Sequence, residues 1–139
     1  MTLTPEQEEW LQALESGKYT QGKLKLRAKP TPETAEWSYC CLGIACELFK
    51  DRLTITSSEE ISGFQLVTKY ADSTVAALPN NLVAFLHLNS PLGNFRGPNY
   101  TDKSINCGSL SSLNDSSGKN FQEIAAFIRA NPQLVFTNV

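Results

Sequence analysis

The segment 39–49 constrains the fold more than any other part of the sequence. Cys41, Ile44, Ala45 and Leu48 fall at positions i, i+3, i+4 and i+7, with a phenylalanine directly after them. Apolar residues at this spacing line one face of an α-helix and turn it toward a core. We therefore expect a core helix here, with its cysteines beside or within the apolar stripe.

Helices are also predicted at both ends of the chain and near its middle. The first, over residues 5–16, opens with Thr4-Pro5-Glu6-Gln7, which provides a cap, a proline at the first helical position and a capping box. The last begins with a second capping box at Asn120-Phe121-Gln122-Glu123 and ends at Asn131-Pro132. A third helix is expected over 81–88, and a short helical turn over 109–113.

Strands are predicted from alternation and from β-forming residues. Residues 23–27 alternate strictly, 53–56 form a short candidate, 64–70 are rich in β-formers, and 134–139 could be a short strand. Helices and short strands are thus interleaved with irregular connections. This pattern favours an α+β fold of four main helices packed on a small, mostly antiparallel sheet, in a single domain over residues 1–139.

Composition limits the classes of function. Twelve basic against fourteen acidic side chains give a net charge of −2, which argues against binding nucleic acid by bulk electrostatics. The first residues resemble no secretory signal, and no apolar run approaches the ~20 residues of a membrane span. We therefore expect a cytoplasmic protein of a bacterial host cell. Residues 89–108, rich in proline, glycine and asparagine, are predicted to form a long loop that is functional or flexible.

The four cysteines are predicted to be reduced and structural. Cys40 and Cys41 are adjacent, Cys46 lies about 140° around the helix from Cys41, and Cys107 lies in the loop. This arrangement does not supply the converging pairs that zinc requires, so neither a metal nor another cofactor is expected. Cys41 belongs in the core, Cys46 lies off the apolar stripe, and Cys40 faces elsewhere.

A cysteine-dependent hydrolase is the alternative. Cys40 stands near the start of a helix, where the dipole favours a thiolate, and His87 is the only histidine that could act as its base. This reading requires the two side chains to lie within hydrogen-bond reach of each other or of a shared water.

A polar stretch before the last helix is a candidate ligand site. Asn114, Asp115, Gly118 and Lys119 precede a helix start, where free backbone N–H groups favour an anion and the lysine adds positive charge. The glycine spacing of a Walker loop is absent. The other reading is that these are ordinary turn and cap residues.

A second polar group precedes the core helix. We expect Tyr19, Gln21, Arg27 and Tyr39 to take part in the same ligand site, which two protomers could share. The other reading of this region is a solvated edge strand protected by Lys23 and by the other basic side chains of 23–27.

Four segments of the chain are similar to a family of small, uncharacterised proteins of tailed phages and prophages. These are Trp10 to Gly22, Tyr-Cys-Cys-Leu-Gly at 39–43, Leu78-Pro79, and Leu-Asn-Asp at 113–115 leading into the last helix. The resemblance implies a phage setting and brings no catalytic residue with it. Small phage accessory proteins often act by binding.

The leading hypothesis is therefore a phage-encoded, non-enzymatic binding protein with a role in counter-defence. It would sequester a nucleotide-like signalling ligand or block a host protein, it would act without a membrane, and it could form a homo-oligomer. A structural protein of the virion is a third hypothesis, to which no repeat or heptad pattern lends support.

Overall fold

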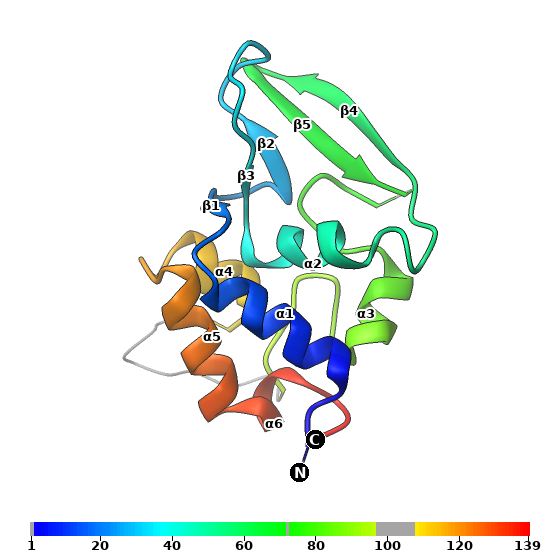
Figure 1. Cartoon of the computed structure of the whole chain (residues 1–139), viewed down its shortest axis with the longest axis vertical. Coiled ribbons are helices and arrows are strands. Elements are labelled where there is room, and N and C mark those ends of the chain that lie inside the picture. The colour runs from blue at the N-terminus through cyan, green and yellow to red at the C-terminus, as the bar shows by residue number, and fades with distance from the viewer. Residues whose placement is uncertain (1, 72, 97–107) are drawn as a thin grey trace.

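A buried central helix organises the fold seen in Figure 1, a computed structural model that describes residues 2–71, 73–96 and 108–139. This helix, α2 (Cys41–Phe49), is buried on every side over its first six residues. Gly43 permits the close contact, because a Cβ atom there would lie 1.6 Å from the backbone oxygen of Leu26. Glycine is the one residue type without that atom.

The prediction that the cysteines are structural residues of the core is confirmed for the three that the structure describes, and only the finer placement of two of them is wrong. Cys41 lies in the core as expected, but Cys46 is equally buried and Cys40 is only 5% exposed. A single apolar stripe does not describe α2, because other parts of the chain pack around the whole helix. Leu48, which the stripe includes, is only partly buried.

Two amphipathic helices pack together beneath α2. Both predicted capping boxes are present, at the starts of α1 (Pro5–Glu15) and α5 (Phe121–Ala130). Helix α1 contacts both α2 and α5, and Figure 1 shows it lying between them. The two helices face the core through a shared set of buried side chains: Trp10, Leu11, Leu14, Phe121, Ile124, Ala125 and Ile128.

Three shorter helices complete this end of the molecule. Helix α3 (Asn80–Leu86) is near its predicted position, and α4 (Leu110–Asp115) extends the turn predicted at 109–113. The strand predicted at 134–139 is wrong, because α6 (Pro132–Val135) occupies its first residues. Proline fits the first turn of a helix, since its missing N–H would be unpaired there.

The sheet stands at the other end, beyond α2, and both chain termini lie at the end far from it (Figure 1). Its strand order is β1-β3-β2-β5-β4, with β1 parallel to β3 and all other pairs antiparallel. The predicted α+β fold, with four substantial helices and a mostly antiparallel sheet, is confirmed. The strands are β1 (Thr20–Gln21), β2 (Arg27–Lys29), β3 (Ser38–Tyr39), β4 (Ser57–Ser62) and β5 (Gln65–Tyr70).

Two predicted strands are displaced or absent. Only Arg27 of the 23–27 alternation lies in β2, because Leu24 has a left-handed backbone (φ 70°) that breaks the extended run. Residues 53 and 54 belong to a turn in which Thr54 is also left-handed (φ 52°), and residues 55 and 56 belong to no strand. The 64–70 strand is confirmed as β5, with Phe64 in the preceding turn.

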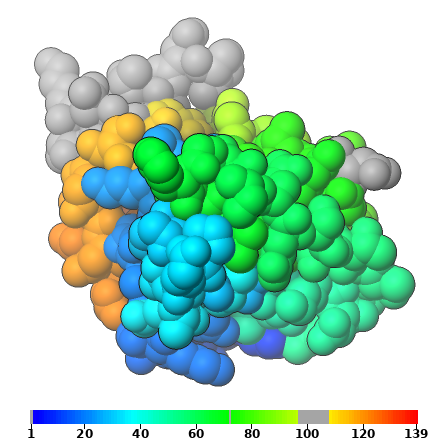
Figure 2. Space-filling model, turned by 90° about the horizontal axis from the view of Figure 1, so that it is seen from above, coloured from blue at the N-terminus to red at the C-terminus, as the bar shows by residue number. Residues whose placement is uncertain are grey.

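The edge strand β4 was not predicted. Each of its six residues is exposed, and the sequence Ser-Ser-Glu-Glu-Ile-Ser carries neither alternation nor a run of β-formers. Figure 2 looks down on this end, where the β4–β5 hairpin (green) and the segment between β2 and β3 (cyan) form the surface.

The predicted loop 89–108 lies partly within the described residues. Over 89–96 the chain forms no helix, and Asn94 makes an isolated β-bridge with Ser109. Residues 97–107, including Cys107, lie outside the described part. None of the described helices combines the length and the apolar character that crossing a membrane requires.

Candidate functional site

One row of side chains crosses the whole sheet. The strand register pairs Gln21 with Tyr39 and Tyr39 with Arg27, places Arg27 beside Thr68, and pairs Thr68 with Glu59. Residues directly opposite each other in a sheet project from the same face. The register therefore gathers three of the predicted site residues on one face.

Arg27 is the centre of this row. Its Nε donates to the Tyr39 hydroxyl (3.3 Å) and its Nη1 donates to Thr68 Oγ1 (3.2 Å). The guanidinium lies 3.6 Å from the centre of the Trp37 ring, and Glu59 adds a carboxylate oxygen at 3.8 Å. The side chain is only 18% exposed, so Arg27 is a fixed cation that holds several aromatic side chains in place.

Beside this row the surface is hollowed, and we call the depression the aromatic hollow. Its volume is about 330 Å³, and the rings of Tyr19 and Tyr39 meet edge to face in its wall, 5.5 Å between centres. Cations flank its rings, with Lys18 Nζ 5.6 Å from the Tyr19 ring and Lys29 Nζ 4.7 Å from the Trp37 ring. Its lining consists of Lys18, Tyr19, Thr20, Ala35, Glu36, Trp37 and Tyr39.

Two oxygen-bearing side chains of the aromatic hollow are defined, one in its orientation and one in its protonation state. Glu36 accepts a hydrogen bond from Thr20 Oγ1 (2.6 Å), which orients its carboxylate at the rim. Burial raises the pKa of the Tyr19 phenol, and the nearby Tyr39 and Glu47 raise it further. Tyr19 is therefore a neutral hydroxyl at physiological pH, able to donate as well as accept.

Both polar atoms of the Asn114 side chain form hydrogen bonds within the protein. It is fully buried, and its Oδ1 accepts from the backbone N–H of Cys41 (3.2 Å) and from Gln21 Nε2 (3.0 Å). Its Nδ2 donates to the Gly22 carbonyl (2.8 Å) and to Asp115 Oδ1 (2.9 Å). The side chain thus joins the start of α2, the segment after β1 and the end of α4.

Other predicted residues near α5 also form hydrogen bonds within the protein. Asp115 Oδ1 accepts from the backbone N–H of Leu24 (3.0 Å), and Gln21 also donates to the Lys119 carbonyl (3.0 Å). Gly118 forms the turn with φ +77°. The structure therefore places Asn114, Asp115 and Gln21 in an internal network, apart from the aromatic hollow that contains Tyr19 and Tyr39.

Sequence reasoning missed Lys18, Lys29, Glu36 and Trp37. A signal for Trp37 was present, because it stands two residues before Tyr39 and alternate residues of a strand share a face. Local signals for the two lysines were present as well, because Lys18 directly precedes Tyr19 and Lys29 follows Arg27 by two residues. Only the sheet register places Lys29 opposite Trp37.

The three cysteines within the described residues do not form a reactive site. Burial raises the pKa of the Cys40 thiol to about 12 and that of Cys41 well above its usual range. His87 ends α3 in a left-handed conformation (φ 57°), and no hydrogen bond connects it to a cysteine within the described residues. In the same part of the chain, no group of three or more His, Cys, Asp or Glu side chains is arranged to hold a metal ion.

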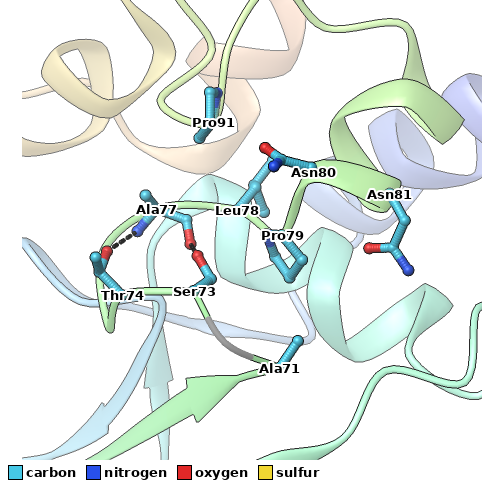
Figure 3. A pocket seen from close by; sticks show the side chains of 9 residues that line it. All are labelled: Ala71, Ser73, Thr74, Ala77, Leu78, Pro79, Asn80, Asn81 and Pro91. Atoms are coloured by element: carbon cyan, nitrogen blue, oxygen red, sulfur yellow. Dashed lines mark hydrogen bonds between the residues drawn. The ribbon is translucent and has the colours of Figure 1, made fainter.

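A second hollow, of about 490 Å³, lies between the end of β5 and the start of α3 (Figure 3). Its hydroxyl groups are already used, since Ser73 Oγ donates to the Ala77 carbonyl and Thr74 Oγ1 accepts from backbone N–H groups. No ionisable side chain is among the described residues that line it. It therefore presents fewer polar and charged groups to a ligand than the aromatic hollow does.

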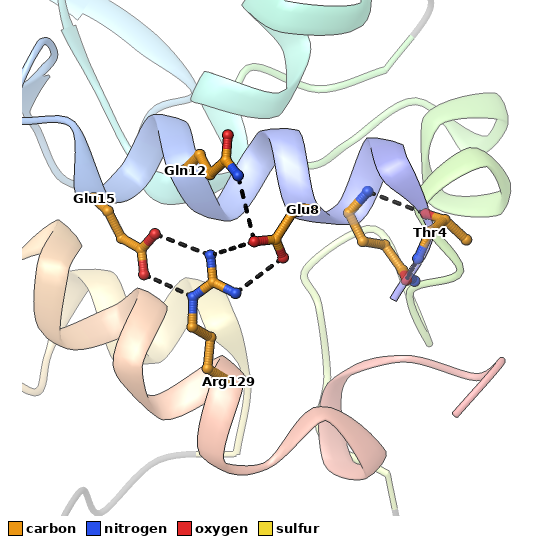
Figure 4. Close-up of polar contacts among 6 residues, drawn as sticks. Thr4, Glu8, Gln12, Glu15 and Arg129 are labelled. Atoms are coloured by element: carbon orange, nitrogen blue, oxygen red, sulfur yellow. Dashed lines mark hydrogen bonds and ion pairs between the residues drawn. The ribbon is translucent and has the colours of Figure 1, made fainter. Parts of the chain in front are cut away.

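The largest cluster of charges joins two helices. Arg129 of α5 bonds to Glu8 through Nη1 (2.9 Å) and to Glu15 through Nε (2.7 Å), both on α1 (Figure 4). Gln12 donates to the same Glu8 carboxylate (3.4 Å). These partners satisfy one another across the α1–α5 contact, so the cluster is structural.

Comparison with known proteins places the chain in a family. No curated protein and no solved structure matches it. A family model for a domain of unknown function, DUF8296, matches residues 5–132. Because this match covers most of the 139 residues, the chain belongs to the DUF8296 family.

Proposed function

We propose that this protein is a phage-encoded, non-enzymatic binding protein that sequesters a nucleotide-like ligand as a counter-defence. The observation that carries the ligand class is the aromatic hollow, where three aromatic rings stand beside cations and one oriented carboxylate. The phage setting rests on the motifs of the sequence, above all Tyr-Cys-Cys-Leu-Gly at 39–43.

The rings suit a nucleobase. Bases stack on aromatic side chains with about 1–3 kcal/mol per base, and this stacking tolerates different bases. The hollow, at about 330 Å³, is within the range of small-molecule sites. Trp37 is held in position by the Arg27 guanidinium, so its ring needs little further ordering when a base binds.

The polar groups suit the rest of a nucleotide. Lys18 supplies a flexible positive charge at the rim for a phosphate. The Glu36 carboxylate can accept hydrogen bonds from ribose hydroxyls, as acidic residues do in dinucleotide sites. A nucleoside with a free ribose and one or two phosphates would use both groups.

The chemistry of the thiols supports binding over catalysis. With a pKa of about 12, the Cys40 side chain stays protonated at neutral pH, whereas a cysteine nucleophile acts as the thiolate. The hydrolase alternative built on Cys40 and His87 therefore has no observation in its favour, and we do not propose it.

Binding can be tested by titrating the protein with ADP-ribose, AMP and a cyclic dinucleotide, followed by calorimetry and by tryptophan fluorescence. Trp37 is the tryptophan at the hollow, whereas Trp10 is buried in the core. A stacked base should quench Trp37, and Trp37→Ala should weaken binding about tenfold or more. If none of these nucleotides binds at up to about 1 mM, the proposed ligand class is wrong.

Two lysine variants separate the phosphate site from general charge. Lys18→Gln should weaken the binding of AMP and leave the weaker binding of adenosine unchanged. Lys69→Gln is the matched control, because this lysine of β5 does not line the aromatic hollow. An equal effect of both variants on AMP would contradict a phosphate site at Lys18.

A further inference from the structure

An exposed leucine is held in a strained conformation at the surface. Leu24 is 67% exposed, and its backbone is left-handed (φ 70°), a region that residues with a Cβ atom adopt at a cost in free energy. Residues 22–26 around it, which we call the Leu24 loop, connect β1 to β2. Figure 2 shows this light-blue part of the chain at the surface, beside the orange atoms of the region of α4 and α5.

Long-range hydrogen bonds fix the Leu24 loop in this shape. Asn114 Nδ2 donates to the Gly22 carbonyl (2.8 Å), and Asp115 Oδ1 accepts from the Leu24 N–H (3.0 Å). At the far end, the Leu26 N–H donates to the Val75 carbonyl (2.8 Å). The Leu-Asn-Asp motif thus has a structural task, which is to hold the loop in one conformation.

The side chain of Leu24 contributes nothing to the core. Leu26, two residues later, is completely buried against α2, whereas the larger part of Leu24 faces solvent. A glycine would fit the left-handed backbone of position 24 without strain. Strained residues of this kind cluster where a protein contacts a ligand or a partner.

Three lysines and one carboxylate, that of Asp115, lie near Leu24. Lys23 and Lys25 flank it, and Lys119 belongs to the same side because its carbonyl accepts from Gln21. None of these three lysines forms an ion pair with a described residue, whereas Arg27, Arg52 and Arg129 all do. Because Lys23, Lys25 and Lys119 outnumber the single carboxylate of Asp115, which already accepts hydrogen bonds from Leu24 and Asn114, the charge around the apolar tip is predominantly positive.

From this we infer that the Leu24 loop is a protein-docking element, whose leucine enters an apolar socket rimmed by carboxylates on a partner protein. A single leucine side chain fits a small apolar pocket on the surface of a folded partner. Because the loop already has one conformation, less conformational entropy is lost on binding. The lysines would steer the encounter and select an acidic rim. This surface is separate from the aromatic hollow and does not depend on it.

The first test separates docking from a structural role. Leu24→Gly and Leu24→Asn both tolerate a left-handed backbone but remove the apolar side chain. If the leucine serves a partner, the midpoint of thermal unfolding should stay unchanged or rise in both variants, and AMP titrations should match those of the wild type. A lower midpoint in both variants would assign Leu24 to folding and overturn the proposal.

The second test identifies what Leu24 touches. A photoactivatable amino acid is introduced at position 24, and in a control at position 64, where Phe64 is 88% exposed at the hairpin tip. The protein is cross-linked in the organism that carries its gene. We expect a discrete adduct from position 24 alone, with a cross-linked peptide that contains apolar residues next to Asp or Glu.

Charge reversal completes this test. Lys23→Glu with Lys25→Glu should lower the adduct yield roughly tenfold, and added salt should lower it too. The proposal is overturned if no discrete adduct forms at position 24, if the cross-linked peptide is not acidic, or if charge reversal leaves the yield unchanged. Nucleotide binding is measured on the same variants, so failure of one site is distinguishable from failure of the other.

Discussion

The helical end and the sheet end of this protein use polar side chains differently. At the helical end, charged groups pair with each other, as Arg129 does with Glu8 and Glu15 (Figure 4), and apolar side chains fill the interior. At the sheet end, β4 is exposed throughout and aromatic rings stand beside cations in a surface hollow. The contrast teaches that the helices provide stability and that the sheet end presents the groups able to bind.

The strongest way to break this comparison is to disturb the contact between α2 and the chain leading into β2. Gly43→Ala would place a Cβ atom 1.6 Å from the Leu26 carbonyl oxygen, and backbone atoms on both sides must then move. We expect a loss of about 3 kcal/mol or more in the free energy of unfolding. Urea denaturation measures it.

Gly108→Ala is the control for this substitution. A Cβ atom at Gly108 would have no neighbour within 4 Å among the residues that the structure describes, so its effect should stay below about 0.5 kcal/mol. Similar losses of unfolding free energy in the two variants would show that the fold does not depend on the close approach of α2 to the backbone of Leu26.

The second prediction concerns the link between the two ends. Asn114→Ala leaves the Cys41 N–H and the Gln21 amide without their buried acceptor, and we expect a loss of about 2–3 kcal/mol. Asp115→Ala removes the acceptor of the exposed Leu24 N–H and of one Asn114 Nδ2 hydrogen bond. Because Asn114 Nδ2 keeps its bond to the Gly22 carbonyl, this variant should cost about 1 kcal/mol. If chemical denaturation gave the reverse order, the network would be centred on Asp115.

The third prediction concerns the sheet end alone. Trp37→Ala should lower the free energy of unfolding by no more than about 1 kcal/mol, because the ring lines a surface hollow. Trp10→Ala should cost about 3–5 kcal/mol, since that ring is buried and donates to the Cys41 carbonyl. A large loss for Trp37→Ala would give the sheet end a structural role and remove the contrast.

The smallest expected effect is a dependence of stability on pH. The Arg129 guanidinium, through its hydrogen bonds and charge, lowers the pKa of Glu8 below its ordinary value of 4.5. This stabilisation is fully present above pH 4.5 and is lost as the pH falls through the lowered value. Because the pair is largely exposed, its contribution should stay below about 1 kcal/mol.

Replacing the partner checks the origin of this effect. In Arg129→Met, the unfolding free energy measured between pH 3 and 6 should fall less steeply with acid than in the wild type. Identical profiles in the two proteins would show that Glu8 gains nothing from Arg129.

The helices could be predicted from the sequence because their signals are local. A capping box spans four residues, so Thr4 with Gln7, and Asn120 with Glu123, mark the two helix starts without any tertiary information. The strands 23–27 and 53–56 were mispredicted because left-handed residues interrupt them. The hydrogen bond that the Leu24 N–H donates to Asp115 spans 91 residues and has no local signal.

The candidate site was only partly predictable for the same reason. Tyr19, Tyr39 and Arg27 were identified from their chemistry, but the register of a sheet decides which of their neighbours join them. The asparagine and aspartate of the polar stretch were assigned to a ligand, and the structure uses their hydrogen-bonding groups inside the protein instead. Polar residues before a helix look alike in sequence whether they bind a ligand or another part of the chain.

The exposed edge strand β4 bears on how this protein behaves at high concentration. An open edge is a template for pairing with a second chain, and stacked strands lie about 4.8 Å apart. Because the other edge of β4 pairs with β5, two copies could meet only through the one free edge. In an antiparallel pairing centred on Glu59 and Glu60, these side chains would face each other across the new contact, and their like charges would oppose it. Replacing both glutamates with uncharged residues would remove this repulsion, and the protein should then become prone to edge-to-edge association.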